Sequence, residues 1–140
     1  MPFTVGVRDR CMYSHSLRFG NEEPFRTGCT AVVDVKLTGP ELNSDGVLCD
    51  ILAAQRALRS VLEGFEHVDL DTLPVFAGKN MTVEVVAQAI CVEFITQLKT
   101  VGAPAPITAI SVSVAESDIA SAAFLLEAPP GGSLLGPDAP

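Results

Sequence analysis

The spacing of apolar residues changes twice along this 140-residue chain, and that change restricts the folds available to it. From Phe3 to Leu17 and again from Thr30 to Leu37, apolar and polar residues alternate, as in half-buried strands. Between residues 49 and 98 the apolar positions recur every three or four residues, as in amphipathic helices. Alternation returns from Ile107 to Val114, and a short apolar run at 122–126 follows. The sequence therefore predicts the order β-β-α-α-β-β.

Turn-forming residues separate these elements. A polar break from Asn21 to Arg26 divides the first two strands, which we expect to form an antiparallel pair. The first helix is predicted from about Cys49 to Gly64. The second is predicted to begin after Asn80 or Thr82, either of which can cap it, and to end at Gly102.

Two helices on one face of a four-stranded antiparallel sheet give an α+β class and one domain, which we place at residues 1–128. Residues 129–140 are rich in Pro and Gly, so we expect a flexible tail there. The sheet leaves two edges, and such edges are usually covered or paired. The pattern therefore favours a homo-oligomer.

Composition excludes several classes of function. The formal net charge of −8 disfavours binding to nucleic acid or to an anionic membrane. The chain has no Trp and a single Tyr, which leaves no stacking platform for single-stranded nucleic acid. Its four cysteines form no CxxC pair, and the first residues lack a basic leader with an apolar core. We expect a cytoplasmic protein with reduced thiols that binds a small molecule.

Four stretches of the sequence form recognisable motifs. They are Tyr13-Ser14-His15-Ser16-Leu17, Thr27-Gly28-Cys29-Thr30-Ala31, Glu66-His67-Val68-Asp69-Leu70-Asp71 followed by Asn80-Met81-Thr82-Val83-Glu84, and Val112-Ser113-Val114-Ala115-Glu116-Ser117. In their order and spacing they resemble motifs of the 6-pyruvoyltetrahydropterin synthase and 6-carboxytetrahydropterin synthase family. The resemblance implies a T-fold (tunnelling fold), in which strands from several chains close into a barrel. It also implies a trimer or hexamer with active sites between subunits.

The resemblance implies a role for each candidate site residue. The family holds zinc with three histidines, and His15 is similar to the first of them. Thr27 and Cys29 stand where the other two are expected. A neutral hydroxyl is a poor zinc ligand, so His15 and Cys29 would be the only metal ligands, and we expect a protein without zinc in which both contact substrate. The alternative is a zinc site completed by a third group such as Glu23.

The remaining candidates are acids and bases. Glu116 resembles the glutamate that binds the pterin ring in the family. It is a carboxylate on the apolar parity of its strand, where an ionised group needs a partner. The alternative to substrate binding is an ion pair with an arginine of a neighbouring subunit. Glu66 and His67 resemble the family's proton-relaying Asp-His pair, against the alternative of a solvated surface histidine. Glu23 occupies the spacing of the family's catalytic Cys or Glu, although a loop carboxylate is often only solvated.

Four arginines and one further acidic residue are the last candidates for a functional role. Arg8, Arg10, Arg18 and Arg26 lie near the start of the chain and could build a pocket for an anionic substrate, although Arg8 and Arg10 fall on the polar parity. We read Glu84 as a charge that favours the start of the second helix.

These residues predict a lyase or cyclase that carries out acid-base elimination, tautomerisation or cyclisation on a small heterocyclic or carbonyl substrate in a specialised biosynthetic pathway. Two alternatives stay open. One is a zinc-dependent 6-pyruvoyl- or 6-carboxytetrahydropterin synthase. The other is a non-catalytic homologue that binds a pterin or purine.

Overall fold

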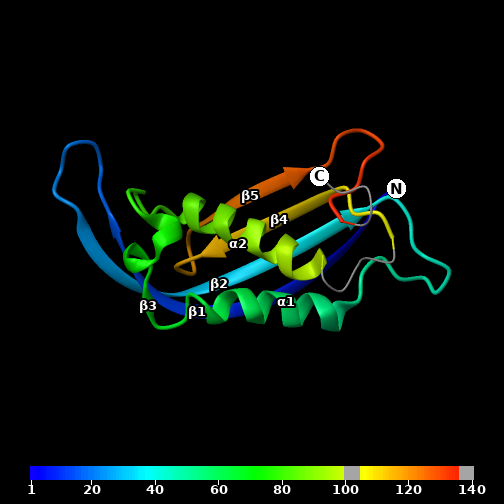
Figure 1. Ribbon diagram of the computed structural model, residues 1–140, viewed down its shortest axis with the longest axis horizontal. Coiled ribbons are helices and arrows are strands. Elements are labelled where there is room, and N and C mark those ends of the chain that lie inside the picture. The colour runs from blue at the N-terminus through cyan, green and yellow to red at the C-terminus, as the bar shows by residue number, and fades with distance from the viewer. Residues whose placement is uncertain (100–104, 136–140) are drawn as a thin grey trace.

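The structure is a computed structural model that describes residues 1–99 and 105–135 (Figure 1). It contains the predicted β-β-α-α-β-β order together with a two-residue strand and two short 3-10 turns. The elements are β1 (Phe3–Leu17), β2 (Phe25–Gly39), α1 (Ile51–Glu63), β3 (Val68–Asp69), η1 (Leu70–Thr72), η2 (Pro74–Phe76), α2 (Val83–Lys99), β4 (Ala109–Ala115) and β5 (Ser121–Glu127).

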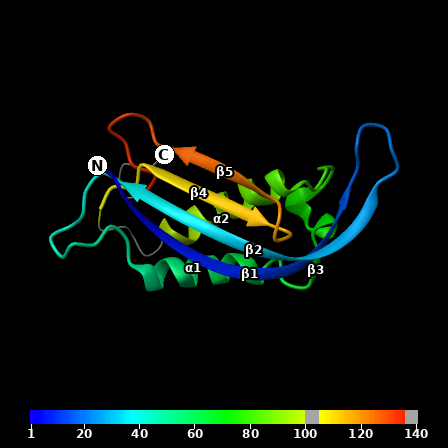
Figure 2. The same ribbon diagram turned by 180° about the vertical axis from the view of Figure 1, so that it is seen from behind.

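The strands form one sheet in the order β3-β1-β2-β4-β5, seen uncovered in Figure 2. All pairings are antiparallel except that of β3 with β1. The β1–β2 hairpin is the longest pairing and runs from Phe3↔Gly39 to Leu17↔Phe25. The prediction of an antiparallel first pair is confirmed.

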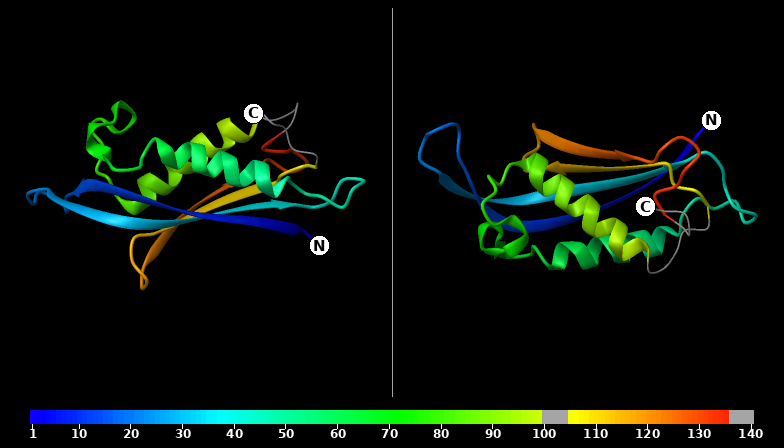
Figure 3. Two further views of the ribbon diagram at one scale, coloured as in Figure 1. Left: turned by 90° about the horizontal axis from the view of Figure 1, so that it is seen from below. Right: turned by 45° about the horizontal axis from the view of Figure 1, so that its top comes forward.

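Both helices pack on the same face of the sheet, as Figure 3 shows. The face of α1 that contacts the sheet carries Ala54, Leu58 and Leu62, and each is at most 1% exposed. On α2 the equivalent positions include Ile90 and Phe94, both fully buried. The apolar stripes read from the sequence are therefore the residues that form the core.

Side-chain caps fix where the helices begin. The Asp50 carboxylate accepts hydrogen bonds from the backbone N–H groups of Leu52 and Ala53 at the start of α1. The Thr82 hydroxyl accepts from the Val85 N–H at the start of α2, so Thr82 rather than Asn80 is the cap. The predicted end of the second helix at Gly102 lies outside the described residues.

The second strand begins five residues earlier than the sequence predicts. Phe25 to Cys29 carry too little alternation to be recognised alone, but they pair with β1 down to Leu17. Asn80 holds this end of the hairpin, since its side-chain amide accepts from the Arg18 N–H and donates to the Arg18 carbonyl. Arg26 also pairs with the carboxylate of Asp69. Contacts from distant loops therefore lengthen the strand.

The second structural difference from the sequence prediction is β3, which lies in a stretch predicted to be a loop. The His67 N–H donates to the Met12 carbonyl, and Val68 then pairs with Tyr13. His67 has a φ of 57°, a left-handed conformation that is uncommon for residues other than glycine. The short strand therefore fixes His67 at the edge of β1 in a strained backbone.

Residues 133–135, within the Pro/Gly-rich segment 129–140 for which we predict flexibility, pack on the core. Leu134 and Leu135 are 4% and 3% exposed. The Leu134 N–H donates to the Ile107 carbonyl, and the Ser133 hydroxyl accepts from the Ile107 N–H. These bonds hold residues 133–135 beside the beginning of β4.

No helix in the described residues combines the length and apolar character needed to cross a lipid bilayer.

Gly39, at the end of β2, provides a test of the packing around the sheet. A Cβ added there would clash with the Pro106 carbonyl oxygen and lie 2.6 Å from Leu48 Cδ1. We therefore expect Gly39→Ala to lower the free energy of unfolding by about 2 kcal/mol or more in urea titrations. Gly6→Ala is the matched control, because its nearest neighbours would be 3.8 Å away. Equal stability of the two variants would contradict this account of the packing.

Candidate functional site

Three sequence-predicted residues meet on the helix-covered face of the sheet. In the β1–β2 register, Tyr13 lies opposite Cys29 and His15 lies opposite Thr27, so these side chains share a face. Glu116 directly follows β4, where Ala115 pairs with Val32. The three ligand atoms, one each from His15, Cys29 and Glu116, lie within 4.8 Å of one another. We call this set the His-Cys-Glu trio.

His15 is held on both sides of its ring. Its Nδ1 lies 2.6 Å from the Met81 carbonyl oxygen, in the segment before α2, and its Nε2 lies 3.1 Å from Glu116 Oε2. The Tyr13 hydroxyl donates to Glu116 Oε1 over 3.1 Å. His15 is fully buried and is the one polar residue among the buried side chains of the described chain. Each partner therefore satisfies a polar group that would otherwise be costly to bury.

These contacts set the protonation of the site. Hydrogen bonds to Cys29 and Glu116 raise the pKa of His15 from 6.5 to about 10, against the opposing effect of burial. For Glu116, burial favours a higher pKa, but the hydrogen bonds from His15 and Tyr13 outweigh it and lower the pKa below 4.5. Burial, with Cys29 and Glu116 nearby, raises the pKa of Tyr13. Without a metal, the site at pH 7 holds a cationic imidazole against a carboxylate.

The chemistry of the trio fits a zinc ion. An imidazole nitrogen, a thiolate and a carboxylate are the ligand types that zinc takes, and catalytic sites use three protein ligands. Zinc-binding histidines usually donate their other ring N–H to a carbonyl or carboxylate, and the Met81 carbonyl is placed to accept from Nδ1. The sequence supplied two ligands and left the third unidentified. The structure brings Glu116, expected to bind substrate, into that position.

Two further sequence candidates lie apart from these contacts. Thr27 faces the same side as His15, but its hydroxyl donates to the Gly28 carbonyl over 3.5 Å. Glu23 is exposed in the turn between β1 and β2, four residues before Thr27. In the described part of the chain, no hydrogen bond or ion pair links Glu23 to the trio.

Glu66 and His67 form a separate cluster beside α1. His67 Nε2 lies 3.4 Å from Glu66 Oε1, and Arg59 Nη2 lies 3.6 Å from Glu66 Oε2. Arg59 also pairs with Asp9 at 3.2 Å. The His67 side chain is 71% exposed, whereas that of Glu66 is 31% exposed. Arg59 therefore holds the carboxylate that orients an exposed imidazole.

A groove of about 710 Å³ brings His67 near the trio's strands. It is bordered by β1, β2 and β3, and its lining includes both Cys29 and His67. The groove is open to solvent and contains residues of both clusters. It is a candidate binding surface for a small molecule.

The expected anion pocket is reduced by pairing among the described residues. Arg8 donates to Asp34 over 2.7 Å, which raises the pKa of the Arg8 guanidinium. Arg26 pairs with Asp69 and lies 3.9 Å from Asp71. Glu84 lies exposed in the first turn of α2, as predicted for a charge at a helix start. Arg8 and Arg26 are thus already neutralised by carboxylates.

Sequence reasoning missed Tyr13 and the Met81 carbonyl. Tyr13 is the only tyrosine and lies two residues before His15 on the buried parity, so its position was a usable signal. The Met81 carbonyl had none, because a backbone group carries no side-chain identity. Glu116 was found, but only the fold could reveal its proximity to Cys29.

Comparison with known proteins shows the family and the fold of this chain. Residues 4–127 match the family described as 6-pyruvoyl tetrahydropterin synthase. The chain is similar in structure to 6-pyruvoyl tetrahydropterin synthases from Plasmodium vivax and Plasmodium falciparum, at 15% and 16% identity and a TM-score of 0.77 for each. For each pair the match covers 91% of this chain and 99% of the other.

A more distant structural match is the 6-pyruvoyl tetrahydropterin synthase of Caenorhabditis elegans. It is 19% identical, with a TM-score of 0.57, and covers 90% of this chain and 96% of that chain. No protein of curated function matches the sequence. The structural matches bear out the predicted T-fold, and the family match spans nearly the whole described fold. This chain belongs to the 6-pyruvoyl tetrahydropterin synthase family.

Proposed function

We propose that the protein is a pterin-synthase-like lyase or cyclase that acts by proton transfer on a small heterocyclic or carbonyl substrate. The observation that carries the proposal is the convergence of His15, Cys29 and Glu116 within 4.8 Å. The trio lies on positions that resemble the family's metal and substrate motifs. It combines an imidazole, a thiol and a carboxylate, which are ligand types that a zinc ion takes.

In this proposal the trio holds a zinc ion, with Glu116 as the third ligand. A zinc ion supplies Lewis acidity, which polarises a substrate oxygen and lowers the pKa of a hydroxyl bound to it. The chain's own contribution is positional: Met81 orients the His15 ring and Tyr13 orients the Glu116 carboxylate. This differs from the expectation of a zinc-free site, because the sequence alone supplied only two ligands.

His67 is proposed as the proton-transferring group, with Glu66 orienting its ring. Its imidazole is exposed at the sheet edge, where it can reach a molecule bound against a neighbouring chain. The strained backbone at His67 is the kind of feature that clusters at functional sites. We propose a trimer or hexamer in which His67 serves the trio of an adjacent subunit.

Glu23 is proposed as a second acid or base. Two structural neighbours are Plasmodium vivax 6-pyruvoyltetrahydropterin synthases in which a catalytic glutamate was replaced by alanine or by cysteine. A carboxylate can therefore serve in catalysis on this fold. Glu23 lies in the turn that joins the trio's two strands, and its exposure leaves it free to meet a substrate or a second subunit.

A non-catalytic ligand-binding protein is the competing function. The observation that favours it is that both Glu116 oxygens already have partners, His15 and Tyr13. A site satisfied in this way is stable without a metal and resembles a structural network. The two functions differ in whether zinc and turnover accompany ligand binding.

The zinc proposal predicts about one zinc ion per chain in protein purified without chelators, measured by inductively coupled plasma mass spectrometry. Cys29→Ser and Glu116→Gln should each reduce the zinc content to below about a tenth, because each removes a ligand. Thr27→Ala is the control and should retain zinc, since the Thr27 hydroxyl bonds to the Gly28 carbonyl and not to the trio. Full zinc content in Glu116→Gln would exclude Glu116 as a ligand.

The proton-transfer proposal predicts that His67→Asn lowers kcat by about 100-fold or more, with KM little changed. The substrate to test is dihydroneopterin triphosphate, which the resemblance to the family implies. Asparagine is chosen because it tolerates a left-handed backbone. Turnover is followed by mass spectrometry of the pterin products. Glu84→Gln, an exposed change at the start of α2, should leave the rate unaffected. Unchanged turnover in His67→Asn would remove His67 from the mechanism, and wild-type binding without turnover would favour the non-catalytic function.

In metal-free protein, the His15–Glu116 pair predicts a distinct dependence of stability on pH. The raised pKa of His15 gives stability that is complete below about pH 6.5 and lost as the pH rises through about 10. The lowered pKa of Glu116 gives stability that is present above about pH 4.5 and lost on acidification. The contribution of this pair to the free energy of unfolding, measured by urea titrations, should therefore be greatest between about pH 4.5 and pH 6.5.

Glu116→Gln tests that dependence. It leaves the His15 charge buried without its carboxylate, so we expect a loss of about 3 kcal/mol at pH 6 and a smaller loss at pH 10. Glu84→Gln serves again as the control for removal of one negative charge. If the free energy of unfolding of wild type and of Glu116→Gln changed with pH in parallel, the pair would contribute nothing to the pH dependence of stability.

A further inference from the structure

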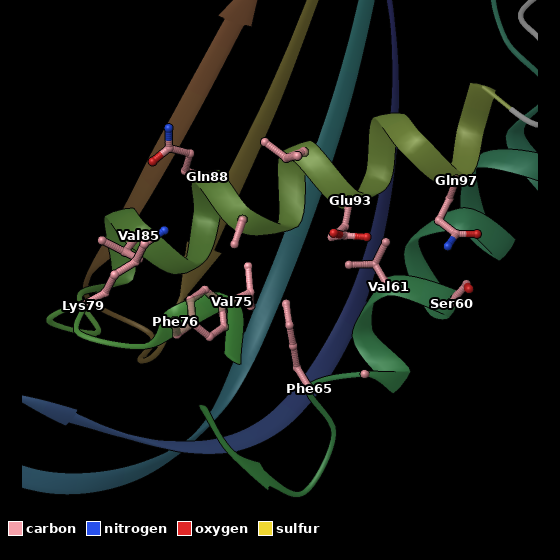
Figure 4. Close-up of a pocket in the computed structure, with 13 residues that line it drawn as sticks. Ser60, Val61, Phe65, Val75, Phe76, Lys79, Val85, Gln88, Glu93 and Gln97 are labelled. Carbon is pink, nitrogen blue, oxygen red and sulfur yellow. The ribbon is translucent and has the colours of Figure 1, made fainter. Parts of the chain in front are cut away.

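A second cavity lies on the other side of the helices, away from the His-Cys-Glu trio. It has a volume of about 430 Å³ and is enclosed by α1, the η2 turn and α2 (Figure 4). This volume falls within the range of small-molecule binding sites. None of the residues that line it belongs to the trio or to the Glu66–His67 pair.

The walls of this cavity are mostly apolar and aromatic, and Ser60, Gln88 and Gln97 are their uncharged polar members. The rings of Phe65 and Phe76 lie 5.8 Å apart at its base, tilted by 45°. Val75 on η2 and Val92 on α2 border it and are 59% and 54% exposed, which is unusually high for side chains in an apolar cluster. Solvent therefore contacts an apolar surface that a flat ring would cover.

One cation stands at this cavity. Lys79 is the only Lys or Arg between Arg59 and Lys99, in a protein with a net charge of −8. In the described part of the chain its ammonium group has no hydrogen bond or ion pair. Figure 4 shows Lys79 at the η2 end of the cavity, whereas Glu93 lies nearer α1. The cavity thus has an apolar body with a positive and a negative end.

We infer that this cavity is a second ligand site, for a planar aromatic compound that carries one anionic group. The ring lies over Phe65 and Phe76 and covers Val75 and Val92, while the anionic group pairs with Lys79. Glu93 repels the anion from the opposite end, which gives the ligand one orientation. This site is independent of the proposed catalysis, because it uses none of the same side chains.

Anilinonaphthalene sulfonate is a suitable probe, since it has an aromatic body and one sulfonate. N-phenylnaphthylamine is its uncharged counterpart. We expect saturable binding of the anionic probe with one site per chain, measured by its fluorescence, and weaker binding of the neutral probe. Lys79→Glu should weaken binding of the anionic probe by at least about threefold and leave binding of the neutral probe unaffected. Lys36→Glu, on exposed β2 surface, is the matched charge control.

Filling the cavity gives a second test. Ala89 lines it from α2, and Ala89→Trp places the only tryptophan of the chain inside it. Both probes should then lose binding by at least about tenfold, with the circular dichroism spectrum and unfolding midpoint retained. If that variant fails to fold, Val75→Ser is used in its place, and it should weaken binding of both probes by a few-fold.

Three outcomes would overturn the inference. Undiminished probe binding in folded Ala89→Trp would place the probe elsewhere. Equal affinity of the charged and neutral probes in wild type would remove the role of Lys79. Dissociation of the oligomer in Ala89→Trp, measured by light scattering, would show that a second copy of the chain covers the cavity.

Discussion

The register of β1 against β2 is the constraint on which the site depends. It sets Tyr13 opposite Cys29 and His15 opposite Thr27, so that every side chain of this end of the hairpin has a defined face. A shift by one residue would turn His15 out of the core, because successive strand residues point to opposite faces. The bonds of Asn80 with Arg18 and the pairing of Arg26 with Asp69 oppose that shift. Residues outside the trio thus maintain the geometry of a site in which they take no chemical part.

This arrangement explains how far the sequence could be read. Alternation and helical spacing were sufficient for the four main strands and two helices, because burial on one face leaves a periodic signal. The same parity predicted that His15 and Glu116 face the core. The first residues of β2 and the whole of β3 left no such signal, because they are held by long-range pairing with β1.

The site was predictable residue by residue but not as a constellation. His15, Cys29 and Glu116 are separated by as many as 101 positions, and only the sheet order β1-β2-β4 brings them together. Counting zinc ligands along the sequence therefore stopped at two. Glu116, the carboxylate expected to bind substrate, proved to lie where a third zinc ligand is needed. This coincidence depends on where β4 ends.

That coincidence has a chemical consequence for recognition. If Glu116 binds zinc, its oxygens are committed, and it cannot also accept two parallel hydrogen bonds from a pterin ring. Ring recognition must then come from other groups. The open groove beside β3 offers hydroxyls, backbone groups and the Asp69 carboxylate, which is paired with Arg26. If Glu116 instead grips the ring, His15 and Cys29 are too few to hold a catalytic zinc. Metal binding and ring anchoring by Glu116 are therefore mutually exclusive within one subunit, which makes this carboxylate the residue that decides between a zinc enzyme and a zinc-free one.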